Sequence, residues 1–208
     1  MGQQANDGSG PAGGLVADKQ GNLYGTTTGG GNSGCAGEGC GTIFELSRGP
    51  GGKLTETVLY TFQGGDDGSA PNSTLVIDAD GNLYGNAFQG GTNNDGTVFT
   101  LRKESGQWKL SAISAQDFGG INPVNPLTLG NTGHIVGETA FGGLHGNGLV
   151  YRFDLANHSF AVENDFYPSA TYGTGPAGGL IFDGQGNLYG VSQMGGEYGL
   201  GLVYSIAQ

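Results

Sequence analysis

The chain has 208 residues, 46 of them glycine, and its formal net charge is −11 with only 7 Lys and Arg residues. Binding to nucleic-acid phosphates depends on clustered basic side chains, so this acidic composition excludes nucleic acid as a partner. No apolar run approaches the roughly 18 residues that a membrane-spanning helix needs, so we expect no membrane insertion.

Four copies of one motif follow one another along the chain. Each has a Pro, a Leu four residues later, a turn that reads Gly-Asn-Leu-Tyr-Gly in three copies, a Gly-Gly pair and a Gly-x-Val-Phe-like run. The last glycines of the turns are Gly25, Gly85, Gly137 and Gly190, so successive copies lie 60, 52 and 53 residues apart. A period of this length indicates one supersecondary unit that buries its apolar face by stacking. We therefore predict a single domain over residues 1–208, with repeats at about 11–70, 71–122, 123–175 and 176–208.

Each repeat reads as four short strands. In the second repeat they are expected near residues 75–78, 82–86, 97–101 and 108–114, bounded by Gly, Asn and Asp. Between the first two strands, the Asp-x-x-Gly-Asn stretch predicts a tight hairpin turn, because Asp accepts backbone hydrogen bonds and Gly adopts positive φ. The third copy has Gly130 for the Asp and His134 for the Asn, which predicts a looser turn.

The pattern Pro-x-x-x-Leu-x-x-Asp-x-x-Gly-Asn-Leu-Tyr-Gly resembles the blade signature of NHL, gluconolactonase-like and two-component-regulator propellers. With its Gly-Gly and Gly-x-Val-Phe elements it is similar to the GloVer tandem repeats of bacterial surface and secreted proteins, over residues 11–206. The resemblance implies an all-β fold, a β-propeller of four four-stranded repeats of about 50 residues. The strand after each Pro is then innermost, and the strand around residues 58–62 is outermost.

The strand count leaves no residues for a last outer strand. We expect a three-stranded fourth blade in a closed four-bladed ring. The alternatives are a homodimer whose two chains join as an eight-bladed ring, and a structural segment of a longer repeat array.

Two cysteines lie in the one loop with an insertion, which makes it five residues longer in the first repeat than in the other three. A disulfide between Cys35 and Cys40 is the preferred interpretation, and it would indicate an oxidising compartment. Reduced, passive thiols are the alternative. A zinc site is disfavoured, because two thiolates fall short of the usual four ligands.

Candidate ligand-binding residues lie on the loops between second and third strands, which share one propeller face with the blade-to-blade loops. Three residues before each Gly-x-Val-Phe-like run, the four repeats carry four different residues, although the glycines on either side recur in every copy. Further polar residues lie close to this position in the sequence. These candidates are Glu38, Asn93, Asp95, His145, Asn147, Glu197 and Tyr198. A pocket of Glu38, Asp95, His145 and Glu197 would hold a divalent cation or supply acid and base groups; the alternative is solvated loop tips.

The chain lacks the sequence motifs of serine hydrolases, of phosphate-binding loops and of zinc proteases. We therefore expect a secreted or cell-surface binding module, located outside the cell, that takes a protein or carbohydrate ligand on its loop face. The alternative is a hydrolase or lyase that acts on a sugar-derived or lactone substrate and whose catalytic residues come from separate blades.

Overall fold

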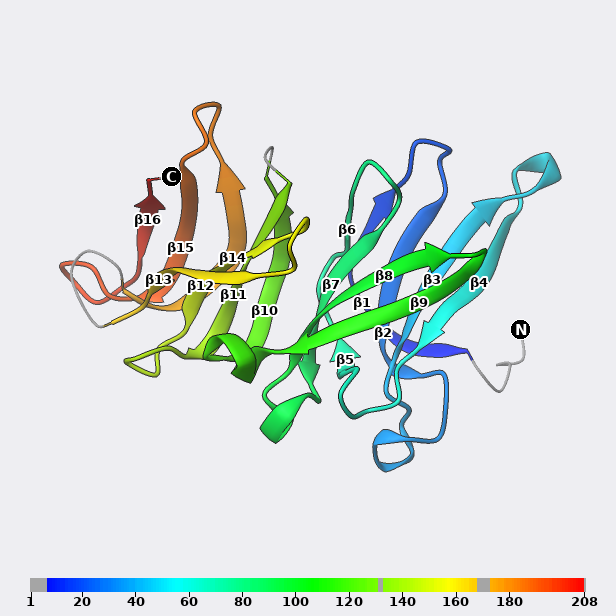
Figure 1. Ribbon diagram of the computed structural model, residues 1–208, viewed down its shortest axis with the longest axis horizontal. Helices are drawn as coiled ribbons and strands as arrows, with labels where there is room; N and C mark the ends of the chain where they lie inside the picture. The colour runs from blue at the N-terminus through cyan, green and yellow to red at the C-terminus, as the bar shows by residue number, and fades with distance from the viewer. Residues whose placement is uncertain (1–6, 131–132, 168–172, 208) are drawn as a thin grey trace. The chain divides into compact units, whose positions relative to one another are not determined.

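The structure, a computed structural model, describes residues 7–130, 133–167 and 173–207. The chain forms two compact units, Met1–Ser114 (unit 1) and Ala115–Gln208 (unit 2), and each contains two antiparallel sheets (Figure 1). Helix within the described ranges is limited to four short 3-10 turns: η1 (Cys35–Gly37), η2 (Pro50–Gly52), η3 (Thr92–Asn94) and η4 (Ala115–Phe118). None of the described helices is long and apolar enough to cross a membrane.

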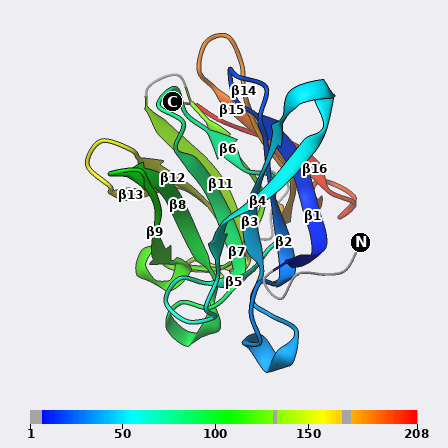
Figure 2. The same ribbon diagram turned by 90° about the vertical axis from the view of Figure 1, so that its right-hand side faces the viewer.

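Unit 1 holds the first two blades. The first sheet has the order β1-β2-β3-β4, and in the second β5 and β6 both pair with β7, which continues to β8 and β9. Figure 2 shows the β2–β3 loop projecting from the opposite end of the first sheet to the β3–β4 hairpin. The strands are β1 (Gly8–Ala17), β2 (Leu23–Gly30), β3 (Thr42–Arg48), β4 (Leu54–Thr61), β5 (Ser69–Pro71), β6 (Val76–Ile77), β7 (Leu83–Gln89), β8 (Thr97–Glu104) and β9 (Gln107–Ser114).

Unit 2 holds the third and fourth blades. One sheet has the order β10-β11-β12-β13, and the other has the three strands β14-β15-β16. The predicted all-β propeller of four blades, with a three-stranded last blade, is therefore confirmed. The strands are β10 (Gly120–Leu129), β11 (His134–Gly142), β12 (Leu149–Asp154), β13 (Phe160–Asp165), β14 (Thr174–Phe182), β15 (Leu188–Met194) and β16 (Leu202–Ile206).

The innermost strand of the second blade differs from its expected course. Instead of one strand over residues 75–78, β5 and β6 each pair with part of β7. The inner strands of the other blades are continuous but irregular at the same place, as between Ala12 and Val16 of β1. Each irregularity follows the repeated Pro, whose missing N–H cannot support a regular ladder.

The predicted hairpin turns form around a half-buried aspartate. Asp78 Oδ1 accepts hydrogen bonds from the N–H groups of Asp80 and Asn82, both at 2.9 Å. Its Oδ2 accepts from Asn82 Nδ2 and from the Tyr84 hydroxyl, both at 2.8 Å. Burial raises the pKa of Asp78, but these hydrogen bonds together outweigh burial and leave the pKa below its ordinary value. Gly81 completes the turn with a φ of 85°.

The same arrangement recurs at Asp18 and Asp183. In the third copy Gly130 N donates to His134 O at 2.8 Å, and residues 131–132, where a looser turn was predicted, lie outside the described residues.

Apolar side chains pack between the two blades of each unit. In unit 1, Tyr24 and Ile43 of the first blade form one cluster with Leu75, Leu83 and Leu101 of the second. We call the surface with which a blade meets the next blade its trailing face, and the opposite surface its leading face.

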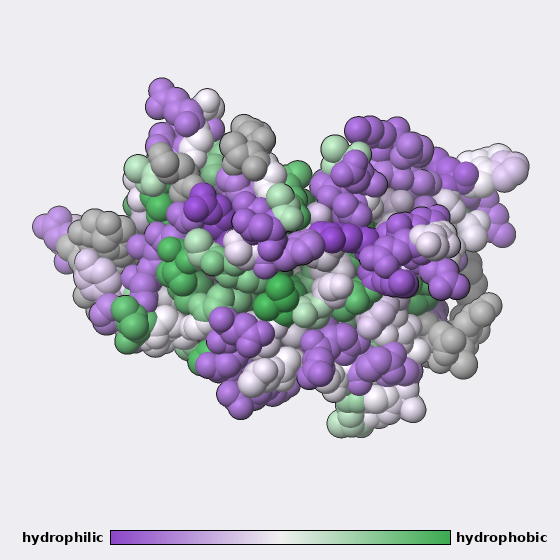
Figure 3. Space-filling model, in the orientation of Figure 1, coloured by the Kyte–Doolittle hydropathy of each residue, from purple (hydrophilic) through white to green (hydrophobic). Residues whose placement is uncertain are grey.

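In unit 2, Val136 and Val150 of the third blade pack in the same way against Leu180 and Leu188 of the fourth. Figure 3 shows hydrophilic residues at most loop tips and hydrophobic residues gathered over β12 and β13. The repeated apolar positions therefore serve blade-on-blade packing, and the loops are left free for other roles.

Candidate functional site

The loops between second and third strands share a frame of glycines. In each blade the glycine that opens the Gly-x-Val-Phe-like run donates its N–H to the carbonyl of the first glycine of the Gly-Gly pair. The base of each loop is therefore fixed, while its tip is free to differ in sequence. These pairs are Gly41 with Gly30 (3.3 Å), Gly96 with Gly90 (2.8 Å), Gly148 with Gly142 (3.1 Å) and Gly201 with Gly195 (3.0 Å).

Gly148 illustrates why this position needs glycine. Its φ is 92°, a left-handed conformation that other residues rarely adopt. A Cβ atom there would also collide with the carbonyl oxygen of Thr139. Any larger residue at this position must distort the base of the loop.

In unit 1 the first loop is closed by a disulfide between Cys35 and Cys40. The bridge lies against Gly64 in the connection between the two blades, where an added Cβ would approach Cys35 Sγ to 2.5 Å and Cys40 Sγ to 2.8 Å. The exposed Glu38 lies inside this loop, and its carbonyl accepts the Gly30 N–H at 2.8 Å. The disulfide thus holds the candidate residue Glu38 on a defined turn.

The second loop of unit 1 carries Asn93 and Asp95. Figures 1 and 2 show this loop projecting from the same end of unit 1 as the β2–β3 loop. Asn94 Oδ1 accepts the Gly90 N–H at 2.8 Å, and Asp95 N donates to Thr92 O at 3.2 Å. The exposed Asn93 lies at the tip, with a φ of 57°.

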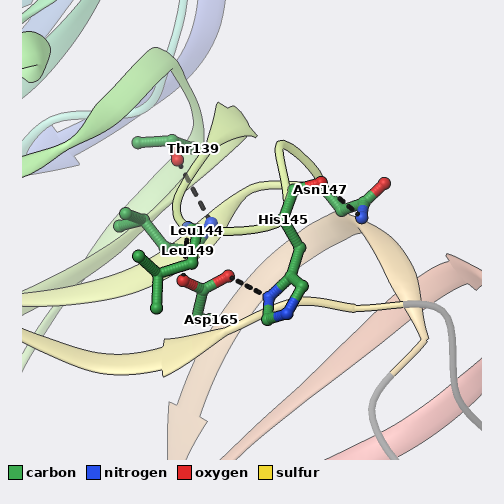
Figure 4. Close-up of polar contacts among 6 residues, drawn as sticks. All are labelled: Thr139, Leu144, His145, Asn147, Leu149 and Asp165. Atoms are coloured by element: carbon green, nitrogen blue, oxygen red, sulfur yellow. Dashed lines mark hydrogen bonds and ion pairs between the residues drawn. The ribbon is translucent and has the colours of Figure 1, made fainter.

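In unit 2, an aspartate from the outer strand holds the loop that contains His145 (Figure 4). Asp165, the last residue of β13, accepts the Leu144 N–H on Oδ2 at 2.6 Å. Its Oδ1 lies 3.3 Å from His145 Nδ1, and Asn147 Nδ2 donates to the His145 carbonyl at 3.0 Å. The carboxylate therefore orients the imidazole, whose side chain is 51% exposed. At the base of the loop, Leu149 N donates to Thr139 Oγ1 at 3.2 Å (Figure 4).

Apolar and aromatic side chains protrude from the loops of unit 2. Leu144 is 91% exposed, Leu200 86% and Tyr198 80%. The His145 ring also lies 5.4 Å from the ring of the partly exposed Tyr167. The two loops belong to neighbouring blades, since β14 contacts both β10 and β11. We call Leu144, His145, Tyr167, Tyr198 and Leu200 the unit 2 loop surface.

The candidates named from the sequence thus fall on four loops. The structure joins His145 and Asn147 by a hydrogen bond, and Glu197 is exposed next to Tyr198. Within the described part of the chain, no three His, Cys, Asp or Glu side chains are grouped so that they could hold a metal ion.

The sequence reasoning missed Asp165, Leu144 and Leu200. A signal for Asp165 exists in the alignment of the repeats, because Ser114 ends the outer strand of the second blade at the equivalent position. Ser114 Oγ accepts the N–H of Thr92 at 3.0 Å, just as Asp165 accepts that of Leu144.

A second residue that the sequence did not single out is the buried Glu138 on β11. Its Oε1 accepts the Tyr204 hydroxyl at 2.6 Å, and its Oε2 accepts Asn125 Nδ2 at 2.8 Å. Burial raises the pKa of Glu138 to about 7, although these hydrogen bonds and one from the Gly179 backbone lower it in part. Glu138 is 1% exposed and joins the third blade to the fourth, so we assign it to the interior rather than to the loop surface.

Comparison with known families identifies the repeat. The model of the Gloeobacter/Verrucomicrobia repeat matches residues 2–204. The chain belongs to this family. The GloVer resemblance drawn from the Gly-Asn-Leu-Tyr-Gly turns is therefore confirmed. No curated protein matches the chain.

Solved structures of similar fold include several propeller enzymes. A luciferin-regenerating enzyme is 14% identical with a TM-score of 0.55, over 94% of this chain and 60% of that one. A gluconolactonase from Xanthomonas campestris is 15% identical with a TM-score of 0.52, over 93% and 61%. A putative 6-phosphogluconolactonase from Bacteroides uniformis is 14% identical with a TM-score of 0.54, over 93% and 56%.

At these identities the likeness establishes the propeller fold alone. The chain spans about 60% of the length of these proteins.

Proposed function

We propose that this Gloeobacter/Verrucomicrobia repeat protein is a secreted or cell-surface module that binds a protein ligand through the unit 2 loop surface. The observation that carries the proposal is the exposure of Leu144, Tyr198 and Leu200 on two loops of neighbouring blades. Large apolar and aromatic side chains that are exposed on the loops of adjacent blades are typical of surfaces that bind another protein.

The loops are also ordered in the way that a binding surface requires. Asp165 holds Leu144 and His145 through two contacts, and the Gly142–Gly148 hydrogen bond fixes the base of that loop. Such a loop loses little conformational freedom when a ligand binds, which favours affinity. A location outside the cell is supported by the disulfide of unit 1, a bond that persists in oxidising compartments.

The experiment is a selection from a random peptide library displayed on phage, with the intact chain as bait. We expect enriched peptides rich in aromatic and aliphatic residues, and about tenfold or greater loss of affinity in a variant with Leu144→Ser, Tyr198→Ser and Leu200→Ser. The matched control is Leu54→Ser with Val162→Ser, which removes exposed apolar side chains from strands outside the surface. Equal binding by the loop variant and the control would refute the proposal, and ligands found only on a glycan array would favour a carbohydrate.

A second candidate function is a hydrolase or lyase for a sugar-derived or lactone substrate. The observation that favours it is the His145–Asp165 pair, in which a carboxylate orients an exposed imidazole as an acid or base catalyst requires. The test is hydrolysis of a panel of aldonolactones by the wild type and by His145→Ala and Asp165→Asn. If each substitution abolishes turnover, the enzyme hypothesis is supported. If neither substitution changes the turnover, a catalytic role of the His145–Asp165 pair is excluded.

A further inference from the structure

The third blade holds a polar pocket beside its β12–β13 hairpin, at the end of β12 opposite to the loop that contains His145. The volume of the pocket is about 350 Å³, which lies within the range of small-molecule sites. Except for Ala161, each of its lining residues has a polar side chain. The lining residues are His134, Arg152, Asp154, Asn157, Ser159 and Ala161.

The strand register places the ionisable side chains of the pocket on one face of the sheet. His134 is the direct cross-strand partner of Asp154, and Arg152 is the partner of Ala161. The other partner of Arg152 is Val136, which packs on the trailing face. Cross-strand partners point to the same side of a sheet, and so do residues two apart in one strand. His134, Arg152 and Asp154 therefore all lie on the trailing face.

The third blade differs from the first at the residue next to Arg152. In the first blade the hydroxyl of Tyr24 donates to the turn aspartate Asp18 at 3.0 Å, and the cross-strand partner of Tyr24 is Glu45. The corresponding pair in the third blade is Val136 and Arg152. Valine has neither the ring nor the hydroxyl of tyrosine, so it leaves room beside the Arg152 side chain.

The turn of the third blade has changed together with this pair. Gly130 stands where the other copies have the aspartate, and His134 where they have the asparagine. A Cβ atom added at Gly130 would lie 2.6 Å from His134 Nε2, so an aspartate is incompatible with this position of the imidazole. The three replacements together give the third blade an open polar pocket in place of the hydrogen-bonded turn of the other blades.

Hydrogen-bond donors and acceptors lie side by side in the pocket. Arg152 Nε donates to Glu163 Oε1 at 2.9 Å, and a guanidinium carries four further N–H donors. Asp154 Oδ1 accepts two backbone N–H groups of the hairpin, and Oδ2 is a second acceptor. Those backbone hydrogen bonds hold the pKa of Asp154 below its ordinary value, so the carboxylate is charged at neutral pH. Asn157 and Ser159 add an amide and a hydroxyl, which can both donate and accept.

The charges around the pocket favour a neutral ligand. Burial and the nearby Arg152 lower the pKa of His134, so the imidazole is neutral at pH 7. Of the remaining groups, Arg152 is positive, while Asp154 and Glu163 are negative. An anion would therefore meet two carboxylates, and a cation would meet the guanidinium. Hydroxyl groups carry no charge and both donate and accept hydrogen bonds, so they match a guanidinium next to a carboxylate.

We propose that this pocket binds a neutral sugar through two adjacent hydroxyl groups, one that accepts a hydrogen bond from Arg152 and one that donates to Asp154. The side chains of Asn157 and Ser159 contact further hydroxyl groups of the same ring. The pocket shares no residue with the unit 2 loop surface, so this proposal does not depend on the proposed function.

The test is saturation-transfer NMR of the intact chain with a panel of neutral monosaccharides and disaccharides, followed by titration of each sugar that binds. Glucuronate and glucosamine serve as charged analogues. We expect a neutral sugar to bind with millimolar or tighter affinity and more tightly than either charged analogue. A disaccharide that binds better than its monosaccharides would identify the end of a glycan as the ligand, and equal affinities would identify a free sugar.

Two conservative substitutions test the residues that carry the proposal. Arg152→Lys removes the planar set of donors, and Asp154→Asn keeps an Oδ1 acceptor for the hairpin while it removes the charged acceptor. Each should weaken sugar binding by at least about tenfold, as expected for hydrogen bonds to charged groups. The matched control is Arg48→Lys with Asp80→Asn, which makes the same exchanges at exposed positions of unit 1 and should bind like the wild type.

Chemical shifts of the isotope-labelled chain locate the site independently of the variants. Titration with the sugar should shift the backbone amides of residues 152–161 and leave those of residues 143–148 and 195–201 unchanged. Circular dichroism verifies that each variant keeps its strands. The proposal is overturned if no neutral sugar binds at concentrations up to tens of millimolar, or if both pocket variants bind as well as the control. Tighter binding of glucuronate or glucosamine would also overturn it, since the pocket would then select a charged ligand.

Discussion

Replacement of Glu138 by Gln should remove a pH dependence from the stability of the folded chain. The folded-state pKa of Glu138 is about 7, compared with an ordinary value of 4.5. Because the folded pKa is the higher one, the protonated carboxyl stabilises the fold fully below about pH 4.5, and this contribution is lost as the pH rises through about 7. A difference of about 2.5 units at 1.36 kcal/mol per unit amounts to about 3 kcal/mol.

The assay is urea unfolding of the wild type and Glu138→Gln, followed by far-UV circular dichroism between pH 4.5 and 8. The free energy of unfolding of the variant, relative to the wild type, should increase by about 3 kcal/mol across this range. Any constant offset between the two proteins reflects the exchange of a carboxyl for an amide and is not part of the prediction. Glu104→Gln serves as the control, because that side chain is 55% exposed and pairs with Lys109 on the surface. Parallel stability profiles for the wild type and Glu138→Gln would refute the reasoning.

Three further substitutions test the turns and loops by the same unfolding assay. Asp78→Ala removes the acceptor of four hydrogen bonds, including the one that the Tyr84 hydroxyl donates. It should lower the free energy of unfolding by about 2–3 kcal/mol, and a decrease below about 0.5 kcal/mol would contradict the role of the turn. Gly148→Ala should lower the free energy of unfolding by about 1–3 kcal/mol, because alanine is strained at this φ. An unchanged midpoint of urea unfolding would show that the base of the loop tolerates a side chain. Serine at both Cys35 and Cys40 should cost roughly 2 kcal/mol by the chain-entropy model, and identical unfolding with and without the bridge would contradict it.

Much of the fold could be predicted because the sequence repeats its turn chemistry. Asp78, Gly81 and Asn82 specify one hairpin by local hydrogen bonds and backbone conformation, so their recurrence locates equivalent strands in other blades. The missing fourth strand of the last blade follows from counting those strands. The break between β5 and β6 could not be predicted in this way, because it depends on how the stretch after Pro71 pairs with β7.

The candidate site was less accessible to sequence reasoning. His145 was identified because the residue at its loop position varies among the repeats, but Asp165, which orients it, lies 20 residues away at the end of β13. Glu138 shares a register position with Thr26 and Asn86, and a recurring polar residue in a strand gives no sign of its burial until the adjacent blade is placed. A single domain over residues 1–208 stays a prediction.

The central claim, that ligands bind the unit 2 loop surface, is tested most directly by hydrogen–deuterium exchange with a selected peptide ligand. The account predicts new protection of backbone amides at residues 143–148 and 195–201. Protection confined to the hairpin turns near Asp18 and Asp78, or to the trailing face of β14–β16, would contradict it.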